Sequence, residues 1–522
     1  MGDSKKDNIR KLAAGGGLLI FGSFASKGIM YFYRLITANE LGAADYGLLN
    51  LGLSVFWISL TFTQLGLKGG INRKVSEYFG RDEKERMFST VWTSLKITLP
   101  WSILYSTILF FSADFIAKTA FQEPAMKTVI QIFAIAIPFQ TLYSQMESTS
   151  QALKEVKHIT AVDKIFRSLF TTLATAAVLY AGFGLESAIY IQAAAAILSG
   201  LLMTFLVQKY VLPVFSNIKP LRNKDSTDLL KYSYPLLFSG IIGMVMTWTD
   251  TLLLGVLDNA STVGVYNAAY PTAQLLTVIA GGFGSLLFPV VSEHYGKGEK
   301  DEAIDISSTA IKWIFTSSFP LLLIMVIFAT PLLRLLFGET YTSGAPAMAI
   351  LGTAYFIQSL GNHGDTFIKS EDKTKIIFYN SIVAGILNII LNLVLIPMYG
   401  QTGAALATAF SGTLITVVAV LEAYRLFDVQ PYKLRKLIPP TLAGLISAGI
   451  TYFTVKSMFN QTPELVLIPA AGMFGILYVT LYVLFGGLDK NDLIILSQAE
   501  QKIPIEMEKT KEIVKKLADH SP

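Results

Sequence analysis

Residues Val75–Glu85 read VSEYFGRDEKE, and a closely similar stretch, VSEHYGKGEKD, begins 216 residues later at Val291. The same shift aligns GLESA at Gly184 with GQTGA at Gly400, and a shift one residue longer aligns YGLLN at Tyr46 with VGVYN. Three matches at nearly one spacing indicate an internal duplication. We therefore expect a chain built from two tandem copies of one structural unit.

The amino-acid composition predicts that most of each copy lies in lipid. Hydrophobic residues make up 52% of the 522 residues and charged residues 15%, and the mean hydropathy is +0.51. A bilayer-spanning helix needs about twenty apolar residues, and about fourteen stretches are long enough. They lie near residues 13–35, 46–67, 87–111, 130–147, 165–180, 188–207, 229–254, 265–291, 311–329, 347–368, 376–396, 403–423, 437–455 and 465–485.

The fold class that follows is an all-α integral membrane protein of about fourteen transmembrane helices. An even number of helices in each copy gives both copies the same orientation, so two six-helix lobes should be related by a parallel pseudo-two-fold axis along the membrane normal. We assign residues 1–226 to the N-terminal lobe, 227–430 to the C-terminal lobe, 431–487 to two further helices and 488–522 to a tail. Two such lobes can share a cleft and open it to one face of the membrane at a time.

The loops between the spans alternate sharply in their content of Lys and Arg. One set holds nearly all of these residues, including the N-terminus, the loop from Lys68 to Arg86 and the loop from Lys433 to Lys436. Basic loops stay in the cytoplasm, so we expect a multi-pass protein of the cell membrane with both termini cytoplasmic. The tail segment IEMEKTKEIVKKL reads as an amphipathic helix on the cytoplasmic side.

The sequence lacks the residues that several kinds of chemistry need. The chain has no cysteine, which excludes disulfides and thiolate metal sites, and its four histidines share no metal-ligand spacing. The sequence contains no basic stripe with interleaved aromatic residues, which would indicate a nucleic-acid partner. It also contains no GxxxxGK[ST] loop, which would indicate nucleotide hydrolysis. We expect no cofactor and no enzymatic activity. We expect the energy for transport to come from a Na⁺ or H⁺ gradient, or from later consumption of the transported molecule.

Ionisable side chains inside the predicted spans are the candidates for function, because a charge in hydrocarbon costs at least about 2.5–3.5 kcal/mol unless it faces a partner or water. The set is Lys27, Arg34, Lys96, Glu147, Arg167, Asp250, Lys312, His363 and Asp365. The 216-residue shift aligns Lys96 with Lys312, Glu147 with His363, and Arg34 with Asp250. Apart from the histidine, basic residues outnumber acidic ones, which favours an anionic substrate.

Four of these residues are candidates for contact with that substrate. Lys27 lies near the middle of its span, and Lys96 and Lys312 lie about two turns into theirs, where they could converge on an anion; Arg167 completes the group. For Lys27 the alternative is a structural ion pair with Glu147. For Lys96 and Lys312 the alternative is that their side chains reach out to the membrane interface.

The other five residues are candidates for gating or ion coupling. Arg34 and Asp250 lie at the outward ends of their spans, so we expect a salt bridge between the lobes that closes an outer gate; separate anchoring at the interface is the alternative. Glu147, His363 and Asp250 are titratable or cation-binding candidates, and Asp365 joins this group.

Three stretches resemble the polysaccharide transporter family, the O-antigen or lipid-linked oligosaccharide flippases of the multidrug/oligosaccharidyl-lipid/polysaccharide exporter superfamily. They are YRLITANELGAADYG at Tyr33–Gly47, GLKGGINRKVSEYFGRDEKE at Gly66–Glu85 and LIPMYGQTGAALATAFSG at Leu395–Gly412. The resemblance implies a V-shaped pair of six-helix lobes and a substrate that bears sugars on a polyprenyl phosphate or pyrophosphate. The chain departs from the family at Asn39, often basic there, and at Ala43, often proline.

The expected function is therefore a flippase that moves a lipid-linked (polyprenyl or dolichyl phosphate) oligosaccharide from the cytoplasmic to the outer leaflet by alternating access, for surface polysaccharide or glycoprotein synthesis. Glycan-assembly enzymes are candidate partners. Three alternatives remain open: a multidrug exporter of the same fold, a membrane glycosyltransferase or ligase acting on lipid-linked sugars, and a non-transporting scaffold. An enzyme of that kind needs an outward-facing acidic metal motif, whereas Asp45, Asp114 and Asp258 stand alone in the sequence.

Overall fold

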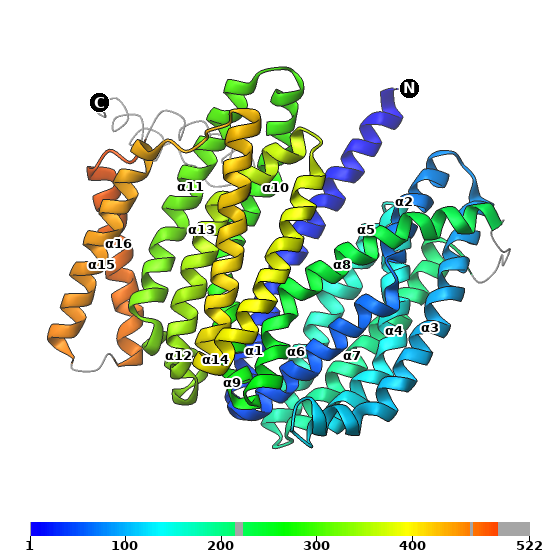
Figure 1. The fold of residues 1–522 in the computed structure, drawn as a ribbon. Helices are drawn as coiled ribbons and strands as arrows, with labels where there is room; N and C mark the ends of the chain where they lie inside the picture. The colour runs from blue at the N-terminus through cyan, green and yellow to red at the C-terminus, as the bar shows by residue number, and fades with distance from the viewer. Residues whose placement is uncertain (1, 215–222, 460–462, 489–522) are drawn as a thin grey trace. The chain divides into compact units, whose positions relative to one another are not determined.

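The computed structural model describes residues 2–214, 223–459 and 463–488, and over those ranges it consists of helices and short connections without a β-strand (Figure 1). The helices are α1 (Gly2–Gln64), α2 (Leu67–Gly80), α3 (Lys84–Thr119), α4 (Met126–Ala152), α5 (Val156–Ile159), η1 (Thr160–Arg167), α6 (Ser168–Tyr180), α7 (Leu185–Leu206), η2 (Val207–Val211), α8 (Asn223–Leu257), α9 (Ala260–Gln274), α10 (Leu276–Gly296), α11 (Lys300–Ile327), α12 (Ala329–Phe337), η3 (Glu339–Gly344), α13 (Ala345–Ser370), α14 (Thr374–Phe427), η4 (Leu434–Leu437), α15 (Ile438–Met458), η5 (Glu464–Val466) and α16 (Leu467–Leu484). The predicted all-α class is confirmed. The predicted tail helix lies outside the described residues.

Two of these helices contain a break at a glycine. Gly42 in α1 has φ 74° and Gly400 in α14 has φ 52°, a conformation that residues with side chains rarely adopt. Each break separates two predicted spans, so α1 has one arm before Gly42 and a second arm after it, and Figure 1 shows the chain turning back at this bend. Gly184, which the duplication aligns with Gly400, precedes α7 and also separates two predicted spans.

Helix covers nearly all of each stretch that was predicted to span the membrane. Nine helices of the described chain are long and apolar enough to cross a bilayer, judged by length and composition. The chain is therefore a multi-pass membrane protein. The number of fourteen spans stays a prediction.

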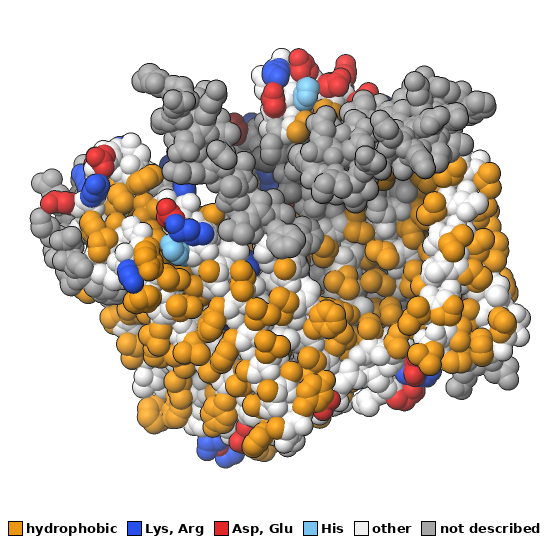
Figure 2. Space-filling view, turned by 180° about the vertical axis from the view of Figure 1, so that it is seen from behind, with side chains coloured by type: hydrophobic (Ala, Val, Ile, Leu, Met, Phe, Trp, Pro, Cys, Tyr) orange, Lys and Arg blue, Asp and Glu red, His pale blue; other side chains and the backbone are white. Residues whose placement is uncertain are grey.

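The outward faces of the helices are apolar, as lipid contact requires. Phe111 and Ile476 are 79% and 72% exposed, values that would be unfavourable in water. Figure 2 shows hydrophobic side chains over most of the visible helix surface, with Lys, Arg, Asp and Glu side chains gathered near the helix ends. This distribution places the helix ends at the membrane interfaces and the middle of each helix in hydrocarbon.

The chain forms two compact units, each with its own core. Unit 1 comprises Met1–Asn267 and Asn392–Gln401, and unit 2 comprises Ala268–Leu391 and Thr402–Pro522. Val75, the first residue of the repeated motif, is fully buried in a core of unit 1, and its counterpart Val291 is fully buried in a core of unit 2. The first residue of the motif is therefore a core residue in both copies. The predicted assignment of residues to six-helix lobes, and the axis between those lobes, stay predictions.

Unit 1 contains a close crossing between two helices that the duplication relates. Gly47 on the second arm of α1 and Gly264 on α9 align under the shift of 217 residues. A Cβ atom on Gly47 would lie 1.7 Å from the carbonyl oxygen of Ala260, and one on Gly264 would lie 1.9 Å from the carbonyl oxygen of Ala43. Small residues four apart on both helices permit this backbone approach, as in other membrane helix pairs. Only glycine fits at the two crossing positions.

Hydrogen bonds beside the crossing also follow the duplication. Asn50 Nδ2 donates to the carbonyl oxygen of Tyr46 at 2.7 Å, and Asn267 Nδ2 donates to that of Val263 at 3.0 Å. The Tyr46 hydroxyl donates across the crossing to the Asn267 carbonyl oxygen at 3.3 Å. The matched YGLLN and VGVYN segments thus form one packed contact, which holds α1 beside α9.

Candidate functional site

A cavity of about 380 Å³ lies inside unit 1, bordered by both arms of α1 and by α4, η1, α6, α7 and α8. Its lining combines two cations with many aromatic rings and neutral polar groups. The cations are Arg34 and Arg167, and Asp163 is the lining carboxylate. The aromatic residues are Tyr33, Tyr46, Phe56, Trp57, Phe133 and Trp248, and the neutral polar residues are Ser26, Asn50, Ser168, Thr171 and Gln192.

Helix α1 supplies more than half of the residues that line this cavity. On the first arm, Ser26, Met30 and Arg34 follow at intervals of four residues, which puts them on one helix face. On the second arm, Tyr46, Leu49, Asn50, Leu53, Phe56 and Trp57 also follow helical spacing along one face. The bend at Gly42 turns both faces toward the same cavity, so one helix with a single break builds two of its walls.

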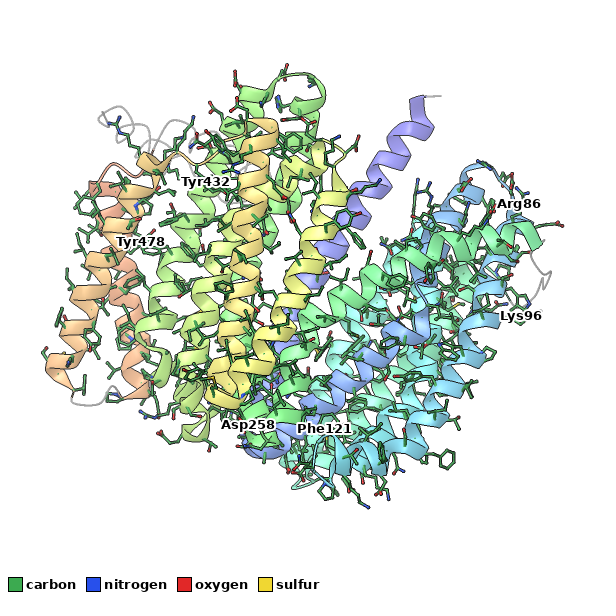
Figure 3. All side chains as sticks on the ribbon, viewed as in Figure 1. Arg86, Lys96, Phe121, Asp258, Tyr432 and Tyr478 are labelled. Atoms are coloured by element: carbon green, nitrogen blue, oxygen red, sulfur yellow. The ribbon has the colours of Figure 1, made fainter. Side chains whose placement is uncertain are left out.

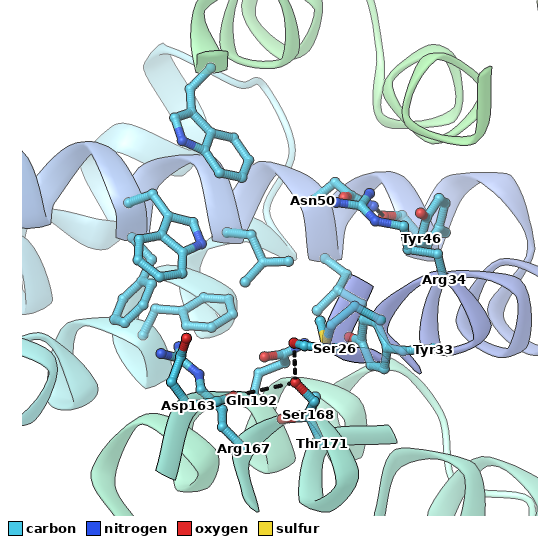
Figure 4. Close-up of a pocket in the computed structure, with 17 residues that line it drawn as sticks. Ser26, Tyr33, Arg34, Tyr46, Asn50, Asp163, Arg167, Ser168, Thr171 and Gln192 are labelled. Carbon is cyan, nitrogen blue, oxygen red and sulfur yellow. Dashed lines mark hydrogen bonds between the residues drawn. The ribbon is translucent and has the colours of Figure 1, made fainter. Parts of the chain in front are cut away.

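A π-helical turn positions the charged residues opposite α1. Thr160–Arg167 forms η1, in which one residue more than usual fits into each turn. The Ser168 hydroxyl bonds the carbonyl oxygen of Asp163, five residues earlier, at 3.3 Å, and its oxygen lies 2.6 Å from Ser26 Oγ. The second contact ties α6 to the first arm of α1, as the dashed line in Figure 4 shows. Through this turn Asp163 and Arg167 both reach the cavity.

The two arginines give the cavity a positive charge that the described protein does not neutralise. The Asp163 carboxylate pairs with Lys164 at 2.6 Å. The Arg167 guanidinium lies over the Trp57 ring, 5.5 Å from its centre. Neither Arg34 nor Arg167 forms an ion pair with a carboxylate in the described part of the chain. Figure 4 shows Arg34 near Tyr46 and Asn50 at one end, and Arg167 near Asp163 at the other.

The three predicted lysines do not line this cavity. Lys27 and Lys96 are exposed, and Lys96 on α3 has its Nζ 5.5 Å from the centre of the Trp92 ring (Figure 3). Lys312 on α11, which the duplication aligns with Lys96, is only 2% exposed. The aligned lysines therefore differ in environment. Their roles in substrate binding stay predictions.

Asp250 on α8 is buried among polar partners. It is 7% exposed, and its two carboxylate oxygens accept hydrogen bonds from the Tyr266 hydroxyl at 2.5 Å and from Asn392 Nδ2 at 2.8 Å. A carboxylate held in this way inside a membrane protein marks a functional candidate. Arg34 lines the cavity, and the proposed gate between Arg34 and Asp250 stays a prediction.

Glu147 on α4 pairs with Lys68 on α2, with Nζ and Oε2 2.7 Å apart. The alternative that Glu147 is the partner of Lys27 is therefore wrong. Lys68 was predicted to lie in a basic loop and not to pair with Glu147, because it follows a predicted span and is 79 residues from Glu147 in the sequence. Ser148 Oγ also donates to the Lys68 carbonyl oxygen at 2.5 Å, so this corner of α2 is fixed to α4 twice.

Breaking this ion pair is expected to destabilise the protein. Lys68→Met should lower the free energy of unfolding by roughly 1–2 kcal/mol, because the Lys68 and Glu147 side chains are 42% and 20% exposed, between a surface pair and a buried one. The variant Lys68→Met/Glu147→Met should recover most of the loss, since no carboxylate is left alone. Thermal unfolding in detergent measures both. A double variant no more stable than the single one would contradict the pairing.

Two of the residues predicted for gating or ion coupling, His363 and Asp365, lie in unit 2, and their surroundings differ from each other. His363 on α13 is 3% exposed, and neither ring nitrogen has a hydrogen-bond partner in the described part of the chain. Asp365 lines a cavity of about 60 Å³ with Asn362 and Asn380, and Asn380 Nδ2 donates to Glu422 at 2.6 Å. Their roles in coupling stay predictions.

Sequence reasoning missed most of the uncharged cavity lining. Asn50, Gln192 and the tryptophans carry no charge, so a search for ionisable groups in the spans passes over them. Helical spacing along residues 46–57 was the available signal, but it does not say which side of a membrane helix faces a cavity. The π-helical turn left no recognisable mark in the sequence.

Comparison with known proteins gives family, relatives and fold. Residues 12–294 match a family described as polysaccharide biosynthesis protein, and residues 235–394 match the MatE family. The probable low-salt glycan biosynthesis flippase Agl15 of Haloferax volcanii is 23% identical over 89% of this chain and 93% of its own. Among solved structures, the lipid II flippase MurJ in an inward closed conformation has a TM-score of 0.64 at 16% identity and covers 91% of this chain and 99% of MurJ.

A second structural neighbour is an inward-facing multidrug resistance transporter of the MATE family. It has a TM-score of 0.66 at 13% identity and covers 77% of this chain and 94% of its own. At such identities the two structures establish a shared multi-helix transporter fold and do not distinguish between their substrates.

Proposed function

Because this chain belongs to the polysaccharide biosynthesis protein family, we propose that it is a flippase that moves a lipid-linked oligosaccharide from the cytoplasmic to the outer leaflet of the cell membrane, with both of its termini in the cytoplasm. The observation that carries the proposal is the cavity of unit 1, with its unneutralised arginines, aromatic rings and neutral polar groups. The relative Agl15 is named a probable glycan biosynthesis flippase, which supports the same substrate class.

The cavity suits a phosphate-linked sugar on chemical grounds. Guanidinium groups form forked, charge-assisted hydrogen bonds to phosphate oxygens, and the bond is stronger away from bulk water. Amide and hydroxyl side chains such as Asn50, Gln192 and Thr171 can exchange hydrogen bonds with sugar hydroxyls, and Trp57 and Trp248 can cover the apolar faces of sugar rings. The polyprenyl chain stays in the bilayer, since moving it into water would expose many methylene groups.

The protein needs no chemical step and no cofactor for this task. Alternating access moves the headgroup by changing which leaflet its binding cavity faces. A multidrug exporter for cationic compounds would be served poorly by two unneutralised arginines, because like charges repel in a low-dielectric cavity. Transport rather than glycosyl transfer is also in keeping with the relatives, which are flippases and transporters.

Deletion of the protein in its native cell tests the proposal. Lipid-linked oligosaccharide should accumulate in the cytoplasmic leaflet and surface glycan should fall, and a plasmid copy should reverse both changes. Sensitivity to cationic dyes should not change. Normal surface glycan without accumulation would contradict the flippase, and new dye sensitivity would favour the exporter.

Asp250 is the residue we propose for ion coupling. Asp250→Asn should leave transport without a gradient within about twofold and remove the acceleration by an imposed Na⁺ or H⁺ gradient, because the neutral amide keeps the shape but cannot bind or release the cation. Transport in vesicles with each gradient in turn measures this. Asp258→Asn, on an exposed carboxylate (Figure 3), is the matched control. Unchanged gradient dependence of the Asp250 variant would remove it from this role.

A further inference from the structure

The two arginines lie at opposite ends of the cavity. Arg167 lies over Trp57, whereas Arg34 lies near Tyr46 at the other end of the cavity (Figure 4). Tyr46 and Trp57 are eleven residues apart on one straight arm of α1, which corresponds to about 16 Å of helix. A pyrophosphate is much shorter than this stretch of helix, which favours its binding to one arginine at a time.

Both arginines are nevertheless available to anions. The one carboxylate in the lining, that of Asp163, is paired with Lys164, and neither arginine has an ion-pair partner in the described chain. The Trp57 ring covers a face of the Arg167 guanidinium, and such stacking leaves the in-plane N–H groups free to meet a planar anion. A pyrophosphate bound at one end leaves the guanidinium at the other end without a counter-charge beside it, and a second anionic group on the occupant would pair with that guanidinium.

The space between the two ends suits uncharged sugar. Asn50 Nδ2 is engaged by the carbonyl oxygen of Tyr46, which leaves Asn50 Oδ1 as an acceptor. Gln192 and Thr171 add further polar groups, and Phe56 adds an apolar surface. The cavity volume of about 380 Å³ is at the small end of the range for ligand sites, roughly 300–1,000 Å³, so it holds a few sugar units at most.

On the basis of the proposed function, we infer that the oligosaccharide carries an acidic sugar, and that Arg167 binds the acid group of that sugar while Arg34 binds the phosphate. The two ends of the cavity differ in charge, and this difference decides which arginine binds the phosphate and which binds the acid group. Asp163 lines the cavity at the Arg167 end while its partner Lys164 does not, so the carboxylate faces the occupant and repels a multiply charged pyrophosphate more than a singly charged acid. The surroundings of Arg34 in the lining are neutral, with Tyr33, Tyr46 and Asn50. Arg167 is then a specificity-determining residue.

Two synthetic substrates separate this role from general anion binding. Both are polyprenyl pyrophosphate disaccharides, one ending in glucose and the other in glucuronic acid, and they differ only in a hydroxymethyl group and a carboxylate. Purified protein in vesicles should move the acidic substrate with a kcat/KM about tenfold higher, the size expected for one charge-assisted hydrogen-bonded pair. Arg167→Gln should reduce transport of the acidic substrate to the level of the neutral one and leave the neutral one within about twofold.

Arg34→Gln should reduce transport of both substrates by the same factor, since both carry the pyrophosphate. Arg167→Lys keeps the positive charge but not the forked pair of N–H donors, so it should retain part of the preference for the acidic substrate. This variant remains informative if Arg167→Gln folds poorly. Equal losses for both substrates in the Arg167 variants would overturn the inference, as would a wild-type protein without preference. Failure of the wild-type protein to move either substrate is a different result, and it would overturn the proposed function together with this inference.

Discussion

Gly264→Ala is expected to destabilise the protein by about 3 kcal/mol or more, although it adds a single methyl group. The new Cβ would lie 1.9 Å from the carbonyl oxygen of Ala43, a backbone atom that can move only if α1 and α9 separate. Such a separation also strains the hydrogen bond from Tyr46 to Asn267. The cost therefore exceeds that of ordinary core overpacking, about 1–3 kcal/mol. Gly47→Ala should behave alike, because its Cβ would lie 1.7 Å from the Ala260 carbonyl oxygen.

Gly243→Ala in α8 is the matched control. Apart from its chain neighbours and the backbone of its own helix, no atom of the described residues lies within 4 Å of the position its Cβ would take. The same change in an open helix position stabilises by about 0.4–1 kcal/mol through the unfolded chain, so the two variants should shift thermal unfolding in opposite directions. Thermal unfolding of purified protein in detergent makes the comparison. A Gly264→Ala variant as stable as Gly243→Ala would show that α1 and α9 do not cross at this glycine.

The second large effect concerns the charge of the cavity. For a lipid-linked oligosaccharide that carries an acidic sugar, the variant Arg34→Gln/Arg167→Gln should lose transport by about 100-fold or more, because each of the two charge-assisted interactions is worth about 1.5–3 kcal/mol. Glutamine preserves much of the side-chain length and polarity, so the packing of the cavity should survive. Restoration of surface glycan in the deletion strain measures the effect in cells, with protein abundance measured beside it.

Arg81→Gln is the control for the loss of a guanidinium group. Arg81 lies at the end of α2 with 57% of its side chain exposed and pairs with Glu77 at 2.9 Å, so its replacement should change transport by less than about twofold. Full complementation by the double variant of the cavity, at normal abundance, would exclude Arg34 and Arg167 from substrate binding.

The fold was largely predictable because lipid imposes a strong pattern on sequence. Apolar stretches of about twenty residues are long signals, and helix covers nearly all of each predicted one. The breaks at Gly42 and Gly400 also follow, since each lies between two predicted spans and glycine tolerates positive φ. The internal duplication also pointed to a contact between helices, because the aligned Gly47 and Gly264 lie at the crossing of α1 and α9.

The site was less predictable, for two physical reasons. Partners such as Lys68 and Glu147, or Asp250 and Asn392, come from distant parts of the chain, and spacing within one helix says nothing about them. A charge in a span also does not show whether it faces a cavity, since exposed Lys96 and buried Lys312 align in the duplication. Arg167, predicted to bind substrate, lines the cavity, and its role in binding stays a prediction. The π-helical turn that positions it has no sequence signature.

Transport of a labelled polyprenyl pyrophosphate oligosaccharide by the purified protein in vesicles tests the central claim most directly. The substrate starts in one leaflet, and a membrane-impermeant glycosidase reports how much has reached the other. Vesicles with the wild-type protein should bring the substrate to both leaflets within minutes, and vesicles with Arg34→Gln/Arg167→Gln should resemble empty ones. Wild-type vesicles that keep the substrate in its original leaflet, whichever ion gradient is imposed, would contradict the account.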